Sequence, residues 1–306
     1  PAQPMRFAFL GTGGSYPSRE RMTQAFAARY RGDVILFDCG EGTQRQMMLS
    51  SLSFMSVKTI AITHFHGDHF LGLAGLVQTM QLNDRRDPIE ILVPKGTAGF
   101  AEAFLELGHF RLKKFEARVR ELGDGERAQY DGYSITAASL NHPVPTIGFR
   151  FEEDAKAGRF DPARAKELGV PEGPLFSKLQ DGHPVEGGKG KVHPEDVMGP
   201  RRNGHAFCYL TDTAPTPRAV EVSKGADVLI MEATADDALT EFANRYGHCA
   251  ASQTAATAKE AGVGELYLVH LSARYKESDP IESQARSVFP KSKVPKDLEE
   301  VELPWG

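Results

Sequence analysis

A dense cluster of metal-binding side chains occupies six positions of the chain: His64, His66, Asp68 and His69. The apolar, β-branched run at 57–62 precedes it and predicts a buried strand. The largely apolar stretch at 70–80 follows it and predicts a helix, so the cluster should lie on a strand-to-helix loop. Packing needs no such density of polar groups, whereas neutral imidazole and carboxylate are preferred ligands of zinc and similar divalent metals. The cluster therefore predicts a metal site.

Further polar residues lie where other strands should end or a helix should begin. The apolar patterns predict strands at 5–10, 33–38, 89–94, 133–138, 146–151, 207–213, 227–233 and 266–272. Polar residues at one edge of a sheet are the expected layout of an α/β active site. Those that follow or end these strands, or stand just before an Ala-rich helix at 250–261, are His142, Asp212, His248 and His270.

Five of the histidines and two of the aspartates are enough ligands for two zinc ions, each with one position left for water. Two adjacent metals suit phosphodiester hydrolysis, because they activate a shared hydroxide and stabilise the phosphorane oxygens. A single structural zinc would instead be closed and rich in cysteine. The three cysteines, Cys39, Cys208 and Cys249, have no CxxC spacing, and we expect them to be buried thiols in a reducing cytoplasm.

Composition limits the class of protein. The chain has 306 residues, 41% hydrophobic and 25% charged, which allows one large globular domain or two small ones. Its net charge of -5 argues against binding nucleic acid by overall charge, although a local basic surface is compatible with it. We expect a short disordered lead-in at 1–4, no leader and no membrane span, because no apolar run is long enough.

The composition shifts between about Glu152 and Gly204, where strand patterning is scarce and Gly, Pro and charges dominate. Between Lys156 and Arg202, nine Lys and Arg outnumber seven Asp and Glu in a chain that is acidic overall. A long insertion without core residues is usually functional or disordered. We expect an arm that projects from the body, with a short helix at 161–168; a disordered linker between domains is the alternative.

The His64-x-His66-x-Asp68-His69 pattern resembles the signature of the metallo-β-lactamase fold. Within that superfamily, the chain resembles the short-form ribonuclease Z family almost from end to end. Gly169–Leu175 resembles the Gly/Pro element of that family's flexible tRNA-binding arm. The other matching motifs, in order, are 9–13, 36–44, 141–142, 210–213, 247–248 and 270–275.

The resemblance implies an α/β fold, an αββα sandwich of two mixed β-sheets flanked by helices. One domain would span 1–306, with a protruding flexible arm inserted at 153–195 as the tRNA-binding exosite. The implied activity is zinc-dependent, endonucleolytic removal of the 3′ trailer from precursor tRNA. The products would be a tRNA with a 3′-hydroxyl and a trailer with a 5′-phosphate, and the enzyme would be a cytoplasmic homodimer.

The resemblance also implies residue roles. Asp68 would orient and deprotonate the attacking water, His248 would protonate the leaving 3′-oxygen, and Arg274 would contact the phosphate. Asp38 would orient a metal ligand rather than bind metal itself. One zinc ion would be held by His64, His66 and His142, the other by Asp68, His69 and His270, with Asp212 bridging them. Substrate contacts would come from Arg19, Arg21, Gly169, Pro171, Gly173, Pro174 and Lys178.

Two departures from the family pattern, at Pro17–Met22 and Met231–Thr234, leave open whether precursors with or without encoded CCA are preferred. Three other functions also stay open. A hydrolase of small phosphodiesters or sulfate esters would share the metal site but not need the arm. A di-iron redox protein would favour a His-x-Glu-x-Asp pattern, which His66 interrupts. A non-catalytic RNA-binding role would need no metal ligands.

Overall fold

The computed structural model describes residues 4–305, so the lead-in predicted at 1–4 lies outside the described residues except for Pro4. The chain forms two compact units. The first contains the residues up to Tyr130, Ser134–Phe151 and those from Ala206 onward, and the second contains Asp131–Tyr133 and Glu152–His205. Within 4–305, none of the helices has the length and apolarity needed to cross a membrane.

The first sheet has seven strands in the order β18-β1-β3-β4-β5-β6-β7. Pairing is antiparallel from β18 to β4 and parallel from β4 to β7. The central strands are buried almost throughout, as expected when both faces of a sheet are covered. The strands are β1 (Met5–Gly11), β3 (Ala25–Tyr30), β4 (Asp33–Phe37), β5 (Val57–Ala61), β6 (Ile89–Pro94), β7 (Ala117–Leu122) and β18 (Glu299–Leu303).

The second sheet also has seven strands, in the order β17-β15-β14-β13-β10-β9-β8. Its β13, β14, β15 and β17 run parallel. Two short strands, β2 (Gly13–Gly14) and β16 (Leu271–Ser272), pair with each other in parallel. The sheet's strands are β8 (Arg127–Tyr130), β9 (Tyr133–Ser139), β10 (Ile147–Glu153), β13 (Ala206–Leu210), β14 (Val228–Glu232), β15 (Glu265–Val269) and β17 (Ser292–Lys293).

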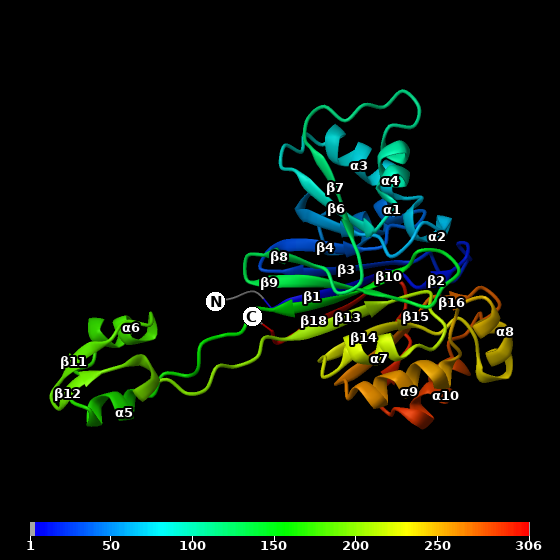
Figure 1. Cartoon of the computed structure of the whole chain (residues 1–306). Coiled ribbons are helices and arrows are strands. Elements are labelled where there is room, and N and C mark those ends of the chain that lie inside the picture. Colours follow the sequence, from blue (N-terminus) through cyan, green and yellow to red (C-terminus); the bar gives the residue numbers. More distant parts are fainter. Residues whose placement is uncertain (1–3, 306) are drawn as a thin grey trace. The chain divides into compact units, whose positions relative to one another are not determined.

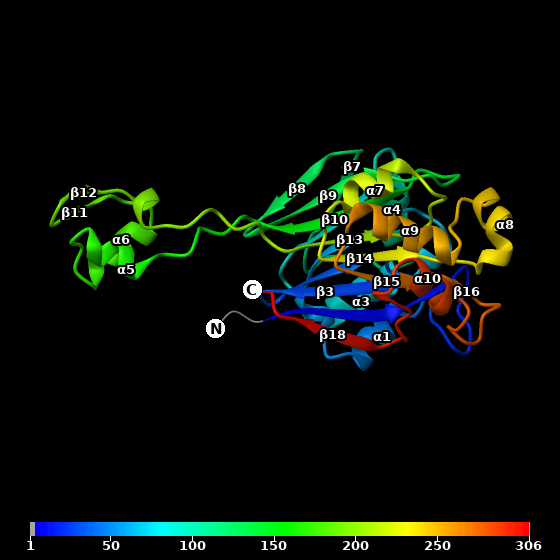
Figure 2. The ribbon, with the colours of Figure 1, turned by 90° about the horizontal axis from the view of Figure 1, so that it is seen from below.

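The two sheets pack face to face through aromatic side chains. The Phe7 and Phe207 ring centroids are 4.9 Å apart, and Phe26 stacks on Tyr209 at 5.7 Å. Helices cover the outer face of each sheet (Figures 1 and 2), so the layers are helix, sheet, sheet and helix, as the resemblance to the metallo-β-lactamase fold implies. On the first sheet these are α1 (Thr43–Leu49), α3 (Leu73–Leu82) and α4 (Ala98–Leu105); on the second, α7 (Pro217–Ser223), α9 (Ala251–Ala261) and α10 (Ile281–Val288).

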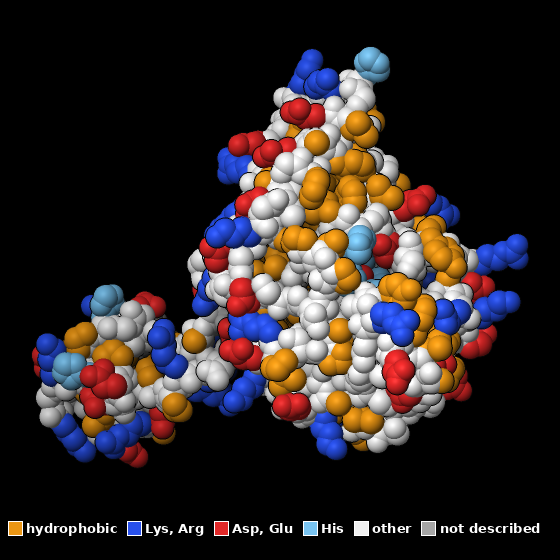
Figure 3. All heavy atoms as spheres, turned by 45° about the vertical axis from the view of Figure 1, so that its right-hand side comes forward, with side chains coloured by type: hydrophobic (Ala, Val, Ile, Leu, Met, Phe, Trp, Pro, Cys, Tyr) orange, Lys and Arg blue, Asp and Glu red, His pale blue; other side chains and the backbone are white. Residues whose placement is uncertain are grey.

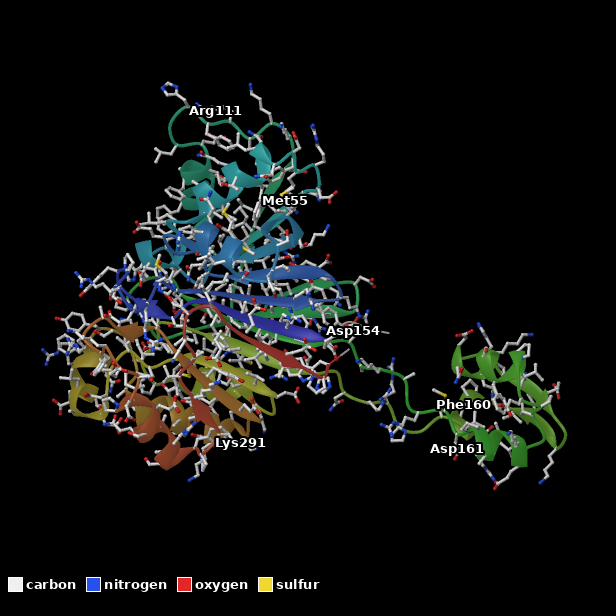
Figure 4. The ribbon with its side chains drawn as sticks, turned by 180° about the vertical axis from the view of Figure 1, so that it is seen from behind. Met55, Arg111, Asp154, Phe160, Asp161 and Lys291 are labelled. Atoms are coloured by element: carbon white, nitrogen blue, oxygen red, sulfur yellow. The ribbon has the colours of Figure 1, made fainter. Side chains whose placement is uncertain are left out.

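The second unit has a small core of its own, so the expectation of an insertion without core residues is wrong. Figure 4 labels Phe160 and Asp161, where this unit's first helix begins. The Phe160 and Phe176 rings pack at 4.9 Å beside buried valines and leucine. Single valines spaced between glycines and prolines leave no periodic signal, which is why the sequence hid this core. Its elements are α5 (Pro162–Glu167), α6 (Pro174–Gln180), β11 (Val185–Gly187) and β12 (Gly190–Val192).

The C-terminal segment contributes to the first unit, although its sequence shows little core pattern. Strand β18 pairs with β1 from Leu303 opposite Met5 to Glu299 opposite Phe9. Val294 and Trp305 are buried. Strand β18 lies at the edge of the sheet and three of its five residues are glutamates, so the sequence looks like a charged tail.

Candidate metal centre

The predicted site residues gather where strands of both sheets end. Asp38 follows β4, the His64–His69 cluster follows β5, and the short helix α2 (Gly67–Phe70) begins inside the cluster. Asp212 lies just past β13, and His270 directly follows β15. Asp38, Asp212 and His270 all have positive φ, at 56°, 51° and 60°. Such values are uncommon outside glycine and cluster at functional sites, where the surrounding structure holds the strained backbone.

One group of ligand atoms comes from His64, His66, His142 and Asp212, all within 4.8 Å of one another. The Nε2 atoms of His64 and His142 lie 3.1 Å and 3.2 Å from Nδ1 of His66. Oδ2 of Asp212 is 3.5 Å from Nε2 of His64. Three imidazole nitrogens and one carboxylate oxygen therefore converge on one point.

A second group comes from Asp68, His69 and His270. The Nε2 atoms of the two histidines are 3.3 Å apart, and Oδ2 of Asp68 lies 3.4 Å from that of His69 and 3.2 Å from that of His270. Oδ1 of Asp212 is 3.2 Å from both histidine Nε2 atoms. Asp212 thus directs one oxygen to each group. Its Oδ1 is buried and accepts no hydrogen bond, as expected of an oxygen whose partner is a metal ion.

Asp38 lies behind His69 rather than among the ligand groups. Its Oδ2 is 2.8 Å from Nδ1 of His69, which leaves Nε2 of that ring directed into the second group. The carboxylate is completely buried and also accepts hydrogen bonds from the Thr63 amide at 2.8 Å and the Tyr209 hydroxyl at 3.0 Å. A ring held in this way has a fixed tautomer and orientation, which is how carboxylates support metal-binding histidines.

Two other histidine rings are oriented by a hydrogen-bond partner at Nδ1. Nδ1 of His142 is 3.0 Å from the Gly247 carbonyl oxygen, and Nδ1 of His270 is 3.0 Å from the Thr234 hydroxyl. In each case Nε2 is the nitrogen that faces the ligand groups. Gly247 has φ +79°, and a Cβ there would lie 2.6 Å from the His142 ring, so this close approach requires glycine.

The charges at the centre suit a divalent cation. Burial, followed by the neighbouring imidazole of His69, lowers the pKa of His64, and burial lowers that of His142. Burial opposes ionisation of Asp68, but His69 and His270 hold the pKa of that carboxyl well below its usual range. Both kinds of group therefore present the protonation state that metal binding requires. Nitrogen and carboxylate donors without cysteine match a catalytic zinc-type site, so the residues present fit a metal.

His69 is the exception among the imidazoles. Burial lowers its pKa, but the carboxylates of Asp212, Asp38 and Asp68 outweigh burial and raise the pKa well above the usual value. A metal ion at Nε2 would take the place of that proton, so metal binding and proton release should be linked.

His248 stands beside the two groups with a different protonation state. Its Nδ1 is 2.9 Å from Oε1 of Glu232, a completely buried carboxylate at the end of β14. Although burial lowers the pKa of His248, Glu232 raises it to about 9. The ring is therefore protonated at neutral pH. Sequence reasoning missed this partnership; the available signal was Glu232, an acidic residue near the end of the apolar run that follows Asp227.

Arg19 and Arg21, both predicted to contact substrate, differ in their surroundings. Arg19 is exposed, whereas Arg21 is half-buried and burial lowers its pKa. Nη1 of Arg21 donates to the Thr12 hydroxyl at 2.5 Å and to the Pro295 carbonyl at 3.0 Å. Its guanidinium therefore connects the loop that contains Arg21 to the C-terminal segment.

Asp297 completes that connection. Its Oδ1 accepts hydrogen bonds from the amide and hydroxyl of Thr12 at 3.0 and 2.7 Å, and its Oδ2 accepts one from the Met22 amide at 2.5 Å. Between Thr12 and Met22, the Ser15 amide donates to Oδ2 of Asp68 at 2.6 Å. The C-terminal segment thus helps to fix a backbone donor at the metal centre.

The other predicted substrate contacts lie in two places. Arg274 is exposed, and its guanidinium carbon is 5.6 Å from the centre of the Phe242 ring. The arm residues occupy the turn between α5 and α6 and the first turns of α6. Gly169 has φ +78° and lies against the backbone of Gly188, so a side chain there would collide. All of the arm residues are exposed: Gly169, Pro171, Gly173, Pro174 and Lys178.

Comparison with known proteins identifies the family. Residues 177–271 match the beta-lactamase superfamily domain, and residues 5–144 match a model of the anti-Pycsar protein Apyc1. The chain is 45% identical to ribonuclease Z of Methanosarcina acetivorans over 302 residues, covering 98% of this chain and 99% of that protein. Ribonuclease Z of Archaeoglobus fulgidus is 38% identical over 300 residues, with 97% of each chain covered. The chain belongs to the ribonuclease Z family.

Solved structures agree with this assignment. Human tRNase Z, short form, matches with a TM-score of 0.72 and 28% identity, covering 98% of this chain and 99% of that one. The Bacillus subtilis metallo-beta-lactamase fold protein YhfI matches with a TM-score of 0.71 at 19% identity, which shows the fold alone. The predicted fold class and the predicted ribonuclease Z family are both confirmed.

Proposed function

We propose that this ribonuclease Z family member is a metal-dependent endoribonuclease that removes the 3′ trailer from precursor tRNA. It would leave a 3′-hydroxyl on the tRNA and a 5′-phosphate on the trailer. The observation that carries the proposal is the pair of ligand groups joined by the two oxygens of Asp212. Such a centre suits hydrolysis of a phosphodiester.

The proposed metal is zinc, with two ions in each subunit. His64, His66 and His142 would hold one ion, Asp68, His69 and His270 the other, and Asp212 both. When bound, the ions would supply a nucleophilic hydroxide at neutral pH and stabilise charge on the phosphate oxygens. The absence of cysteine from the ligand groups favours a site that keeps a position open for substrate.

Asp68 is the proposed general base. Its carboxylate is ionised because His69 and His270 hold its pKa low, and the Ser15 amide fixes its Oδ2 at 2.6 Å. A fixed, ionised carboxylate can orient the attacking water and receive its proton. His248 is the proposed general acid, since Glu232 keeps its ring protonated at neutral pH. Arg274 is the proposed contact to the scissile phosphate, for which a guanidinium is well suited.

The proposed tRNA-binding arm is the segment 153–195, which lies within the second unit. Basic residues outnumber acidic ones between Lys156 and Arg202, in contrast to the whole chain. Local positive charge is what contacts to a nucleic acid backbone require. The exposed turn and helix that carry Gly169, Pro171, Gly173, Pro174 and Lys178 would contact the tRNA, and Arg19 and Arg21 would act near its 3′ end.

The proposed assembly is a homodimer that works in the cytoplasm. Exposed apolar side chains gather on and beside the helices that cover the first sheet, including Phe100 on α4, 60% exposed, and Leu107 just past α4, 70% exposed. They border a hollow of about 320 Å³ lined by Phe65, Phe70 and Phe104. Figure 3 shows hydrophobic side chains gathered over this part of the molecule. An apolar surface of this kind is typical of an interface between subunits. Three free, buried cysteines suit a reducing compartment.

The deciding experiment is cleavage of precursor tRNAs with and without CCA by the purified protein, with both new ends mapped to the nucleotide. A cut at the 3′ side of the tRNA that leaves a 3′-hydroxyl supports the proposal, and Asp68→Ala should abolish it. Elemental analysis of the same preparation would identify and count the metal. Intact tRNA precursors, with turnover of small phosphodiesters only, would favour the general hydrolase instead.

A matched deletion tests the arm. Lys156 and Arg202 pair as an antiparallel bridge, so a short Gly-Ser linker can join them in place of 157–201. We expect this variant to hydrolyse bis(p-nitrophenyl) phosphate like the wild type but to lose most precursor-tRNA cleavage. Equal loss on both substrates would indicate damage to the metal centre, and no loss on either would contradict the role of the arm.

A further inference from the structure

Two exposed aromatic rings lie next to the proposed general acid. Phe242, in the short helix α8 (Thr240–Arg245), and Tyr246, which directly follows that helix, are 48% and 54% exposed. Their ring centroids are 4.9 Å apart. Residues four apart lie on one face of a helix, and here the neighbouring Ala243 packs inward while both rings face solvent. Neither exposed ring packs into the cores of the two sheets or of the second unit.

The two rings and the proposed catalytic residues line the same hollow. It has a volume of about 40 Å³, and its lining includes Phe242, Tyr246, His248 and Arg274. The Arg274 guanidinium lies 5.6 Å from the Phe242 ring centre, a cation–π distance. Tyr246 is followed directly by Gly247, whose carbonyl faces Nδ1 of His142. The aromatic pair is thus held in place by the same segment that supports a metal ligand.

The chemistry of this surface matches an unpaired nucleobase. Aromatic rings and guanidinium planes stack on bases without sequence preference, whereas a hollow of this size is too small to enclose one. A base would therefore lie across the rings rather than enter between them. Figure 3 shows histidine, hydrophobic and Lys or Arg side chains close together on this face.

The position of His248 indicates which base. If His248 protonates the leaving 3′-oxygen, the ribose that carries this oxygen lies against it, and the base on that ribose reaches the adjoining surface. We propose that Phe242 and Tyr246, beside Arg274, form a stacking platform for the last nucleobase retained on the tRNA. This inference rests on the proposed function and adds a binding site to it.

The test combines protein and substrate changes. Phe242→Ala and Tyr246→Ala should each lower kcat/KM for precursor tRNA by roughly 5- to 150-fold, the range for losing one base-stacking contact. Phe242→Tyr and Tyr246→Phe keep a ring and should stay within twofold of the wild type. Glu260→Ala, a truncation of an exposed side chain on α9, should have no effect.

A precursor with an abasic site at the last retained nucleotide separates stacking from a structural role. The wild type should cleave it more slowly by the same factor, and the alanine variants should lose nothing further on it. If the alanine variants lose the same factor in kcat/KM on both substrates, the rings act through the fold and the proposal is wrong. Coupling to an abasic site at the first trailer nucleotide instead would overturn the assignment of the base.

A binding measurement separates this inference from the proposed function. With Asp68→Ala protein, 2-aminopurine at the last retained position of a bound precursor should lose fluorescence, and Phe242→Ala should prevent that loss. If the wild type fails to cleave precursor tRNA, the function is wrong, and the fluorescence still decides whether the rings stack on a base. A change of oligomeric state in the ring variants would assign the surface to a subunit contact and overturn the proposal.

Discussion

At the scale of single residues, the centre depends on which nitrogen of each imidazole faces inward. Asp38 acts on His69, the Gly247 carbonyl on His142, and the Thr234 hydroxyl on His270. The inward nitrogen is Nε2 in each case, and only a nitrogen without a proton can bind metal. The outer partners are therefore part of the metal site, although they contribute no ligand atom.

Asp38→Asn should weaken metal binding while largely preserving the fold. The asparagine oxygen can still accept from the Thr63 amide, but an amide group facing Nδ1 of His69 would favour the proton on Nε2. We expect metal affinity to fall by about 10- to 100-fold, the usual effect of losing such a partner. Competition against a chromophoric chelator would measure it. The exposed Asp87→Asn is the control, and unchanged affinity in Asp38→Asn would contradict the role of Asp38.

Glu232 and His248 predict a pH dependence. The pKa of His248 is raised to about 9, so the ring is protonated below that pH and the protonated ring supports catalysis there. Single-turnover cleavage should decline as the pH rises through about 9. In Glu232→Gln the decline should move to lower pH, toward the ordinary pKa of histidine.

The contact between Glu232 and His248 also makes the stability of the folded state depend on pH. A pKa raised on folding favours the folded state fully below the unfolded pKa of histidine, and this contribution is lost as the pH rises through the folded pKa. His248→Ala should remove both the alkaline decline in cleavage and this dependence of unfolding. An alkaline decline that persists in His248→Ala would assign it to another group.

At the scale of elements, the sequence predicted the strands that carry ligands but not all of their neighbours. A continuous apolar run such as Val57–Ile62 is a strong local signal, and ligands placed after it follow from the layout of α/β sheets. Strand β3 (Ala25–Tyr30) has no such signal, because it contains three alanines and is stabilised by pairing with β1 and β4. The contacts of Asp212 with both ligand groups and of Glu232 with His248 depend on tertiary packing, so local patterns mark these acidic residues but not their partners.

The C-terminal segment offers a test of an element that sequence patterning missed. Asp297 accepts three hydrogen bonds, from the amide and hydroxyl of Thr12 and the amide of Met22. Asp297→Ala leaves these buried donors without a partner and should lower the free energy of unfolding by about 1–3 kcal/mol. Urea denaturation would measure this, with the exposed Asp279→Ala as control. A loss no larger than that of the control would contradict the role given to Asp297.

At the scale of the whole molecule, the burial of the cysteines determines whether reagents in solution can modify them. Burial raises the pKa of the Cys39 thiol to about 12 and that of Cys249 well above its usual value. Thiolate is the reactive form. At pH 8 we expect Ellman's reagent to leave the folded protein unmodified and to label all three cysteines after denaturation. Rapid labelling of the native protein would contradict this.

The proposed dimer is tested at its apolar surface. Phe100→Glu on α4 and Leu107→Glu just past α4 place charges on that surface and should shift the protein toward monomer, measured by light scattering during gel filtration. Desolvating a charge in an interface is strongly unfavourable. Leu49→Glu, an exposed change on α1, is a comparison that maps the extent of the interface. Monomeric wild type would contradict the dimer itself.

The second ligand group also sets an order of events in time. His69 and His270 bring their Nε2 atoms to 3.3 Å across a sequence separation of 201 residues. A ribosome makes the first of these long before the second, so a growing chain holds the cluster at His64–His69 without its partners. Contacts this distant in sequence also form late in folding. The second ligand group is therefore completed late in maturation, and an unfinished chain lacks the residue that closes it.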